Sequence, residues 1–158
     1  MKLRGLTTII SSVAVLAAGI TMLTLSLTTG ATPVSAQSGR NGVIHVQKDC
    51  KEYDQTAGGH CTITASNLGQ IPVNSRVYYD QAPGVPTGLL DSNVVLDAGG
   101  GSRAVGRCTL DFATGLGLCT FSDGTGLLAG FTARVEVSFI SGTLWAWEGT
   151  YRFQPLVR

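Results

Sequence analysis

Apolar and polar residues alternate with a period of two along most of the chain beyond residue 37. The alternation is clearest in two segments near the C-terminus, 130–139 and 144–153. Their shared apolar faces consist of Phe131, Ala133, Val135, Val137 and Phe139 in the first segment and of Trp145, Trp147, Tyr151 and Phe153 in the second. This period is typical of β-strands that turn one face toward a core. We expect these faces to be core; the alternative is that some of the aromatic side chains line a ligand cavity.

The same pattern, interrupted by glycine-rich segments, predicts eight strands and no substantial helix. The expected strands are Val43–Lys48, Cys61–Ala65, Arg76–Asp80, Ser92–Asp97, Ala104–Phe112, Leu116–Ser122, Gly130–Phe139 and Leu144–Phe153. Short strands separated by turn signals are typical of a β-sandwich or of a closed β-barrel. The chain is therefore expected to be all-β, and the pattern alone leaves both architectures open.

Two segments between the expected strands contain turn chemistry. The segment Cys108–Cys119 places two alternating arms around Ala113, Thr114 and Gly115, which predicts a β-hairpin. The segment Ala82–Leu90 contains two prolines and two glycines, and proline donates no backbone hydrogen bond to a sheet. We expect a long surface loop there, of the kind that often borders a binding site.

The first 36 residues have the order of a secretory signal peptide. A segment without charges runs from residue 6 to residue 27, and small residues (Val-Ser-Ala) occupy positions 34–36. We expect cleavage after Ala36, which would leave one secreted, extracytoplasmic domain over residues 37–158. The alternative is an uncleaved anchor, because about 20 apolar residues can span a bilayer.

The charge of the chain gives no reason to expect a nucleic-acid or membrane partner. The full chain has a formal net charge of +1, and loss of Lys2 and Arg4 with the leader would leave residues 37–158 at −1. A nearly neutral domain lacks the basic surface that binds phosphate backbones or anionic lipids.

The four cysteines lie in residues 37–158 and repeat one spacing, Cys50 to Cys61 and Cys108 to Cys119. In an exported chain this arrangement predicts two disulfides. Local pairing is favoured among the three pairings because each pair closes a segment that can form a hairpin. A metal site that includes His60 is the alternative, but the C-x-x-C spacing of zinc sites is absent, so we expect no metal.

No motif of a known enzyme class is complete in this sequence. Gly99–Gly101 and Gly124–Gly126 fit a loose dinucleotide-loop pattern, but we expect a strand and not a helix after each, which favours hairpin turns. The nucleophile elbow of serine hydrolases is absent. Neither His45 nor His60 is favoured as a general base. These tests identify neither an enzyme nor a cofactor, and we expect no cofactor.

The segment Cys119–Phe153 resembles the allene oxide cyclase and dirigent superfamily of small barrels. Its part Ser122–Phe131 is similar to the glycine-rich turn that precedes a long penultimate strand in that family. Upstream, Asn67–Asp80 is similar to the segment of allene oxide cyclases in which Leu-Gly precedes a strand ending near Tyr-Asp. Exported bacterial proteins share a block similar to the Trp-Ala-Trp-Glu-Gly-Thr-Tyr of residues 145–151.

The resemblance implies an eight-stranded antiparallel β-barrel with an apolar lumen open at one end, in a family that often forms dimers or trimers. Allene oxide cyclases control the cyclisation of a lipid epoxide, and dirigent proteins steer the coupling of phenolic radicals; both hold a flexible molecule near one reactive conformer. Allene oxide cyclases have a glutamate in the first strand, whereas Lys48 lies nearest to that position here. The resemblance therefore implies the fold and a cavity, and does not imply allene oxide cyclase activity.

Three hypotheses about function follow. The first is an exported, isomerase-like barrel that binds an apolar small molecule and guides its cyclisation or coupling, which needs polar residues in the lumen. The second is a non-catalytic carrier with an apolar lumen, and the third is a filled barrel that acts through its outer surface. For a ligand-binding lumen, the expected lining residues are Tyr79, Phe131, Trp145, Trp147 and Tyr151.

Overall fold

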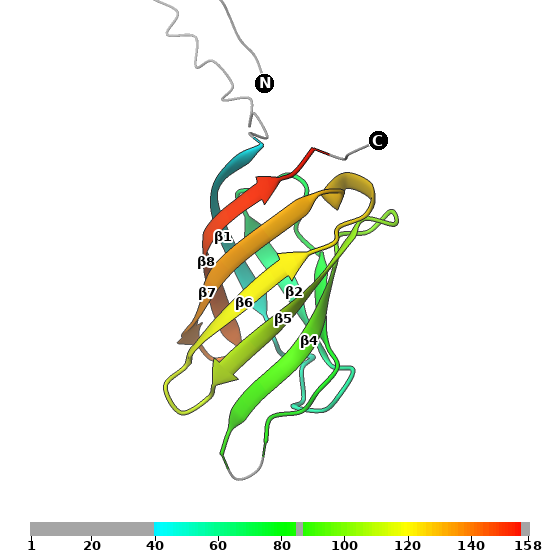
Figure 1. Ribbon diagram of the computed structural model, residues 1–158. Coiled ribbons are helices and arrows are strands. Elements are labelled where there is room, and N and C mark those ends of the chain that lie inside the picture. The colour runs from blue at the N-terminus through cyan, green and yellow to red at the C-terminus, as the bar shows by residue number, and fades with distance from the viewer. Residues whose placement is uncertain (1–39, 85–86, 156–158) are drawn as a thin grey trace, which may run out of the picture. The chain divides into compact units, whose positions relative to one another are not determined.

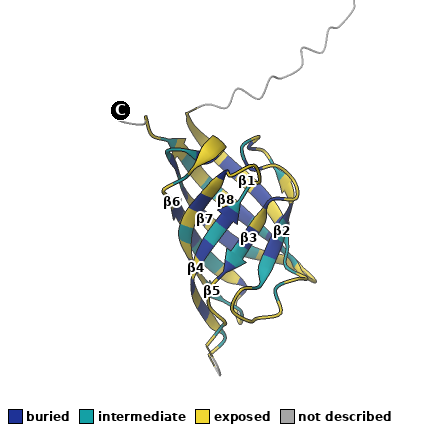
Figure 2. Ribbon diagram, turned by 90° about the vertical axis from the view of Figure 1, so that its right-hand side faces the viewer, coloured by how far each residue is buried: buried dark blue, intermediate teal, exposed yellow. Residues whose placement is uncertain are grey.

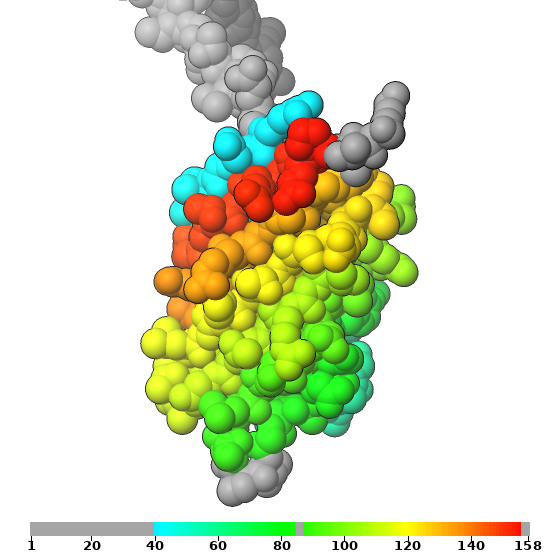
Figure 3. Space-filling view, viewed as in Figure 1, coloured from blue at the N-terminus to red at the C-terminus, as the bar shows by residue number. Residues whose placement is uncertain are grey.

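The computed structural model describes residues 40–84 and 87–155, which form a closed barrel of eight antiparallel strands (Figure 1). The strands are β1 (Asn41–Asp49), β2 (His60–Ser66), β3 (Arg76–Tyr79), β4 (Leu89–Asp97), β5 (Arg103–Asp111), β6 (Leu116–Ser122), β7 (Phe131–Ser141) and β8 (Leu144–Phe153). Each strand pairs with the next, and β8 pairs with β1. Figure 3 shows this closure as β8 (red) lying beside β1 (cyan). The all-β prediction is confirmed, and the architecture is the barrel rather than the sandwich.

The alternation of the sequence separates the inside of the barrel from its outside (Figure 2). On β7, Phe131, Val135 and Val137 are buried, and on β8 the buried residues are Trp145 and Trp147. Burial of apolar side chains contributes about 25 cal/mol per Å² of surface removed from water, so these inward faces are a main source of stability. The prediction that the apolar faces of both segments form core is confirmed for these residues.

Most strand boundaries differ from the sequence prediction by one or two residues, and two differences are larger. Strand β4 begins at Leu89, three residues before Ser92, because Leu89 and Leu90 pair with Asp111 and Leu110 of β5. The expectation that the loop extends to Leu90 was therefore wrong. The second difference is a single turn of 3-10 helix, η1 (Gly126–Leu128), between the second glycine cluster and β7. That cluster is followed by a helical turn and not directly by a strand.

Both predicted disulfides are confirmed. Cys50–Cys61 joins the residue after β1 to β2, and Cys108–Cys119 joins directly opposite residues of β5 and β6. The second bond therefore fixes the register of the predicted hairpin, whose turn spans Phe112–Gly115. Two disulfides are compatible with an extracellular protein.

The predicted signal peptide, residues 1–36, lies outside the residues that the structure describes. The expected domain start at residue 37 lies outside them as well. Over residues 40–84 and 87–155, no helix is long and apolar enough to cross a bilayer.

Candidate functional site: a mouth pocket beside a buried lysine

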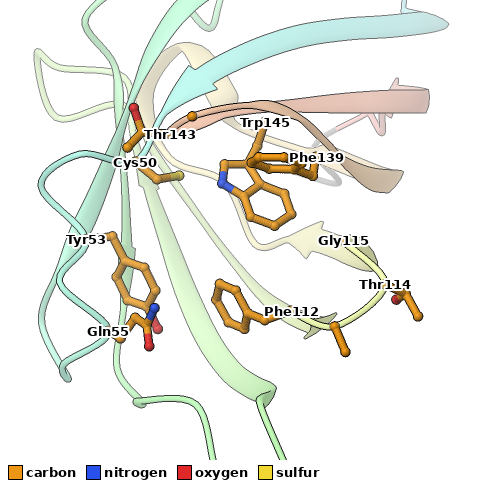
Figure 4. Close-up of a pocket in the computed structure, with 11 residues that line it drawn as sticks. Cys50, Tyr53, Gln55, Phe112, Thr114, Gly115, Phe139, Thr143 and Trp145 are labelled. Atoms are coloured by element: carbon orange, nitrogen blue, oxygen red, sulfur yellow. The ribbon is translucent and has the colours of Figure 1, made fainter.

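A pocket of about 470 Å³ opens at the end of the barrel where β7 ends and β8 begins (Figure 4). We call it the mouth pocket. Its walls come from the β7–β8 turn, from the β5–β6 turn and from the loop that joins β1 to β2. The side chains that define it are Cys50, Tyr53, Gln55, Phe112, Phe139 and Trp145. Small-molecule sites in proteins typically occupy about 300–1,000 Å³, so this pocket has the size of a ligand site.

One wall of the mouth pocket is an aromatic cluster centred on Trp145. The Trp145 ring meets the Phe139 ring edge-on at 5.1 Å and the Phe112 ring at 5.9 Å. The β7–β8 pairing explains the first contact, because Phe139 and Trp145 are register partners. Edge-to-face pairs of this kind are worth about 0.5–1.5 kcal/mol beyond area burial. Phe139 is nevertheless 49% exposed, so this wall offers apolar surface to a ligand.

Lys48 lies on the inner wall of the barrel, next to Trp145. The two residues are register partners on β1 and β8, and Lys48 is only 2% exposed. Its Nζ donates a hydrogen bond of 2.5 Å to the hydroxyl oxygen of Tyr79 on β3. Lys48 faces inward because it alternates with the buried residues Ile44 and Val46 along β1. The barrel therefore encloses a polar pair within an otherwise apolar layer.

Burial without a counter-ion disfavours the charged form of Lys48, although two aromatic rings lie close enough to attract a cation. Nζ lies 4.9 Å from the centre of the Trp147 ring and 5.2 Å from that of the Tyr79 ring. No carboxylate forms an ion pair with Lys48 within residues 40–84 and 87–155. Burial without a counter-ion lowers the pKa of Lys48 to about 7. Burial also raises the pKa of Tyr79, which keeps this phenol neutral.

Two contacts connect the Lys48–Tyr79 pair to the mouth pocket. The Tyr79 ring packs against the ring of Tyr53, a pocket residue, with centroids 4.9 Å apart. The Tyr79 hydroxyl also lies 4.0 Å from the sulfur of Cys61, whose disulfide partner Cys50 lines the pocket. Tyr79 therefore lies between the Lys48 amine and the pocket residue Tyr53.

Trp147 occupies the barrel interior beyond this pair. Its side chain is fully buried and packs against Phe121 with ring centroids 5.1 Å apart. Within the described part of the chain, the indole Nε1 is buried and has no hydrogen-bond partner. A buried donor without a partner costs free energy, so this nitrogen is an available donor to any acceptor brought near it.

The five residues predicted from sequence to line a ligand site lie in three places. Trp145 lines the mouth pocket, whereas Tyr79 and Trp147 flank Lys48 behind it. Phe131 and Tyr151 pack together, with ring centroids 6.4 Å apart, near the opposite end of the barrel. The structure thus brings together three of the five around one site, and a ligand role for any of them stays a prediction.

The remaining candidates from the sequence lie away from this site. His45 faces outward and forms a hydrogen bond with Glu148, and Nε2 of His60 lies 2.5 Å from a carboxylate oxygen of Glu52. The described residues contain no group of three or more His, Cys, Asp or Glu side chains able to hold a metal ion. The β3–β4 loop lies at the mouth end, but none of its described residues lines the mouth pocket.

Sequence reasoning did not select Lys48, Tyr53, Gln55, Phe112 or Phe139 for the site, although the resemblance placed Lys48 nearest to the first-strand glutamate of allene oxide cyclases. Lys48 could have been found from the alternation of β1, where it shares a face with Ile44 and Val46. Val43 is apolar as well, however, so the sequence of β1 did not show which face is inward. Tyr53 and Phe112 lie in connecting segments, where alternation gives no direction.

Comparisons of the chain with models of protein families, with curated proteins and with solved structures found no match. The resemblance to the allene oxide cyclase and dirigent superfamily therefore rests on the sequence motifs alone. We treat that relationship as a proposal.

Proposed function

We propose that this protein is an exported barrel that binds an apolar small molecule in the mouth pocket and guides its cyclisation or coupling. The observation that supports this function best is an aromatic pocket of ligand size next to a buried polar pair. Phe139, Phe112 and Trp145 supply the apolar contact area, and Lys48 with Tyr79 supplies the polar groups. Ligand sites typically combine both features. Apolar contacts hold the molecule, and a small number of polar groups fix its orientation.

The Lys48–Tyr79 pair favours a reactive role over a simple carrier. A buried lysine without a counter-ion lowers the stability of the fold, and a carrier of apolar molecules has no need of it. In a low-dielectric site, a cation or phenol stabilises negative charge that develops on a substrate oxygen. A shaped pocket adds to this by holding the substrate near one reactive conformer. The family resemblance, in which such barrels guide cyclisation or coupling, supports the same role.

The alternative is a non-catalytic secreted barrel that binds or acts through its surface. The observation in its favour is the filled interior, in which Trp147, Phe131 and Ile63 are completely buried. Small eight-stranded barrels are often filled by their own side chains. Under this alternative the aromatic residues contribute only to stability. The dimer or trimer that the resemblance implies stays a prediction under both functions.

The two tryptophans of the sequence make the mouth pocket testable by fluorescence. In Trp147→Phe the remaining indole is Trp145 at the pocket, and in Trp145→Phe it is Trp147 behind it. The probes are a panel of fatty-acid epoxides, polyenes and phenolics. We expect at least one of them to quench the Trp147→Phe protein more strongly than the Trp145→Phe protein. No quenching of either variant by the whole panel would favour the surface alternative.

A further inference from the structure

Lys48 differs in its environment from the other lysine that the structure describes. The sequence contains three lysines, and only Lys48 and Lys51 lie within the described residues. Lys51 is exposed on the loop after β1, whereas Lys48 is buried inside the barrel. Its nitrogen contacts a phenol hydroxyl and two aromatic rings. Such an amine is held in place, shielded from water and not bound to a carboxylate.

Building on the proposed ligand pocket, we infer that Lys48 captures apolar aldehydes or ketones covalently, as an imine at Nζ. The ligand class is a carbonyl compound whose apolar remainder rests on the aromatic wall formed by Phe112, Phe139 and Trp145. Tyr79 is the positioning residue, because its hydroxyl holds the nitrogen at 2.5 Å.

The reaction needs no partner beyond the amine and the carbonyl compound. The lone pair of Nζ forms a bond to the carbonyl carbon while the carbon–oxygen π bond breaks. The oxygen takes up a proton and the nitrogen loses one, which gives a carbinolamine. Loss of the hydroxyl group as water, with loss of the remaining nitrogen proton, leaves a neutral imine. The Tyr79 hydroxyl, hydrogen-bonded to Nζ, can give its own proton to the carbonyl oxygen and take one from the nitrogen in its place, so that the phenol ends neutral.

The environment of Lys48 favours the first of these steps. Only a neutral amine has a free lone pair, and a lysine in water, with a pKa of about 10.4, is almost fully protonated at pH 7. Burial lowers the pKa of Lys48 to about 7, so about half of the molecules carry the neutral amine at that pH. Desolvation in an apolar pocket is a known way to activate lysine toward carbonyl compounds. Exclusion of water from the barrel also slows hydrolysis of the product.

Tyr53 lies between the mouth pocket and Tyr79, on the route to the amine. Its ring covers Tyr79 at the boundary of the mouth pocket, and its half-buried side chain lies in the β1–β2 loop. The Tyr53 hydroxyl makes one hydrogen bond, of 3.4 Å, to the carbonyl of Gln81. A bond of this length is weak, so the Tyr53 ring is held mainly by its packing against Tyr79 and the core. Rotation of Tyr53 away from Tyr79 would open the way to Lys48.

Reductive trapping tests the inference directly. The protein with both disulfides intact is incubated at pH 7 with decanal and cyanoborohydride, which reduces an imine to a stable secondary amine. Mass spectrometry of peptides then measures alkylation at Lys48 and at Lys51. We expect the initial rate at Lys48 to exceed that at Lys51 by at least about tenfold, because the aromatic wall holds the apolar chain of decanal beside Lys48. Glyoxylate, a polar anionic aldehyde, is the control probe and should show no preference for Lys48.

Two variants separate chemistry from folding. Tyr79→Phe keeps the ring and removes the hydroxyl, and should slow alkylation of Lys48 at least about tenfold while Lys51 reacts as before. Tyr53→Ala should speed alkylation of Lys48 by opening its access.

Reaction of decanal at Lys48 no faster than at Lys51 would overturn the inference. If apolar ligands without a carbonyl still quench the fluorescence of Trp145 in that case, the proposal of ligand binding at the mouth pocket is kept and only the proposal of imine formation is rejected. If Lys48 is alkylated but none of those ligands binds, the mouth pocket proposal fails and the imine stands.

Discussion

The Nζ of Lys48 and the hydroxyl oxygen of Tyr79 lie 2.5 Å apart on the inner wall of the barrel, and both side chains are buried. The two residues reach each other from β1 and β3, across the intervening strand β2. A pair of this kind replaces apolar packing and lowers stability unless it is fully hydrogen-bonded. Its effects on stability and on ligand binding can therefore be measured separately.

The first prediction concerns the pH dependence of stability. Burial lowers the pKa of Lys48 from 10.5 to about 7, so between these values the unfolded chain binds a proton that the folded chain does not. The free energy of unfolding therefore rises with pH across this window. From pH 7 to pH 9.5, Lys48 alone should contribute a gain of about 3 kcal/mol.

Urea unfolding of the wild type and of Lys48→Met over this pH range measures that contribution. Other titrating groups affect both proteins, so they cancel in the difference. The wild type should gain stability relative to the variant as the pH rises. If the free energy of unfolding changed with pH in parallel for the two proteins, the pKa of Lys48 would be the same in the folded and unfolded chains. That result would contradict the lowered pKa expected from burial.

The second prediction separates the roles of the two disulfides. Replacing Cys108 and Cys119 together by alanine should lower the free energy of unfolding by about 3 kcal/mol, since each bond closes a loop of similar length in the unfolded chain. Replacing Cys50 and Cys61 should cost a similar amount and also weaken ligand binding, because Cys50 lines the mouth pocket. Equal ligand affinity in both double variants would contradict a pocket at this end of the barrel.

The third prediction concerns the glycine turn between β6 and η1. Gly126 has a φ of 58°, in the left-handed region, and a side chain there would also meet Ser102, so Gly126→Val should lower the melting temperature. Gly124 is not among the positive-φ glycines. It is needed for space, because a Cβ there would lie 1.8 Å from the carbonyl oxygen of Leu128.

A matched alanine control distinguishes this turn from an ordinary loop. Gly124→Ala should cost about 1–3 kcal/mol of stability through overpacking. A Cβ at Gly69 would meet nothing within 4 Å, so Gly69→Ala should change stability by no more than about 0.5 kcal/mol. Equal melting temperatures for the two variants would contradict the close approach at Gly124.

The fold was more predictable from the sequence than the site was. Alternation on β7 and β8 placed Val135, Val137 and Trp147 correctly on the inner face, because a period of two leaves only two faces to choose from. Barrel closure was not predictable from the pattern, because it depends on the pairing of β8 with β1, residues that are far apart in the chain. The prediction of a closed barrel came from the family resemblance.

The composition of the site was less predictable for a physical reason. The mouth pocket is built mainly from ends of strands and from turns, where periodicity no longer fixes the direction of a side chain. Phe139 illustrates this, since it continues the buried face of β7 yet is half exposed at the mouth. Lys48 illustrates a second limit: a lysine is usually assigned to the solvent face, and only the three-dimensional pairing shows that it points inward.

The central claim is that an apolar ligand binds at the mouth pocket, and a matched pair of phenylalanine variants tests it most directly. Phe139→Ala removes a ring from the mouth pocket, and Phe153→Ala removes one where β8 ends, at the opposite end of the barrel. The measurement is the rise in melting temperature that a ligand from the panel causes in each protein, because a ligand that binds only the folded state stabilises it. We predict that the rise is lost in Phe139→Ala and kept in Phe153→Ala. A rise that survives in Phe139→Ala and disappears in Phe153→Ala, or no rise in the wild type with any ligand, would contradict the proposed site.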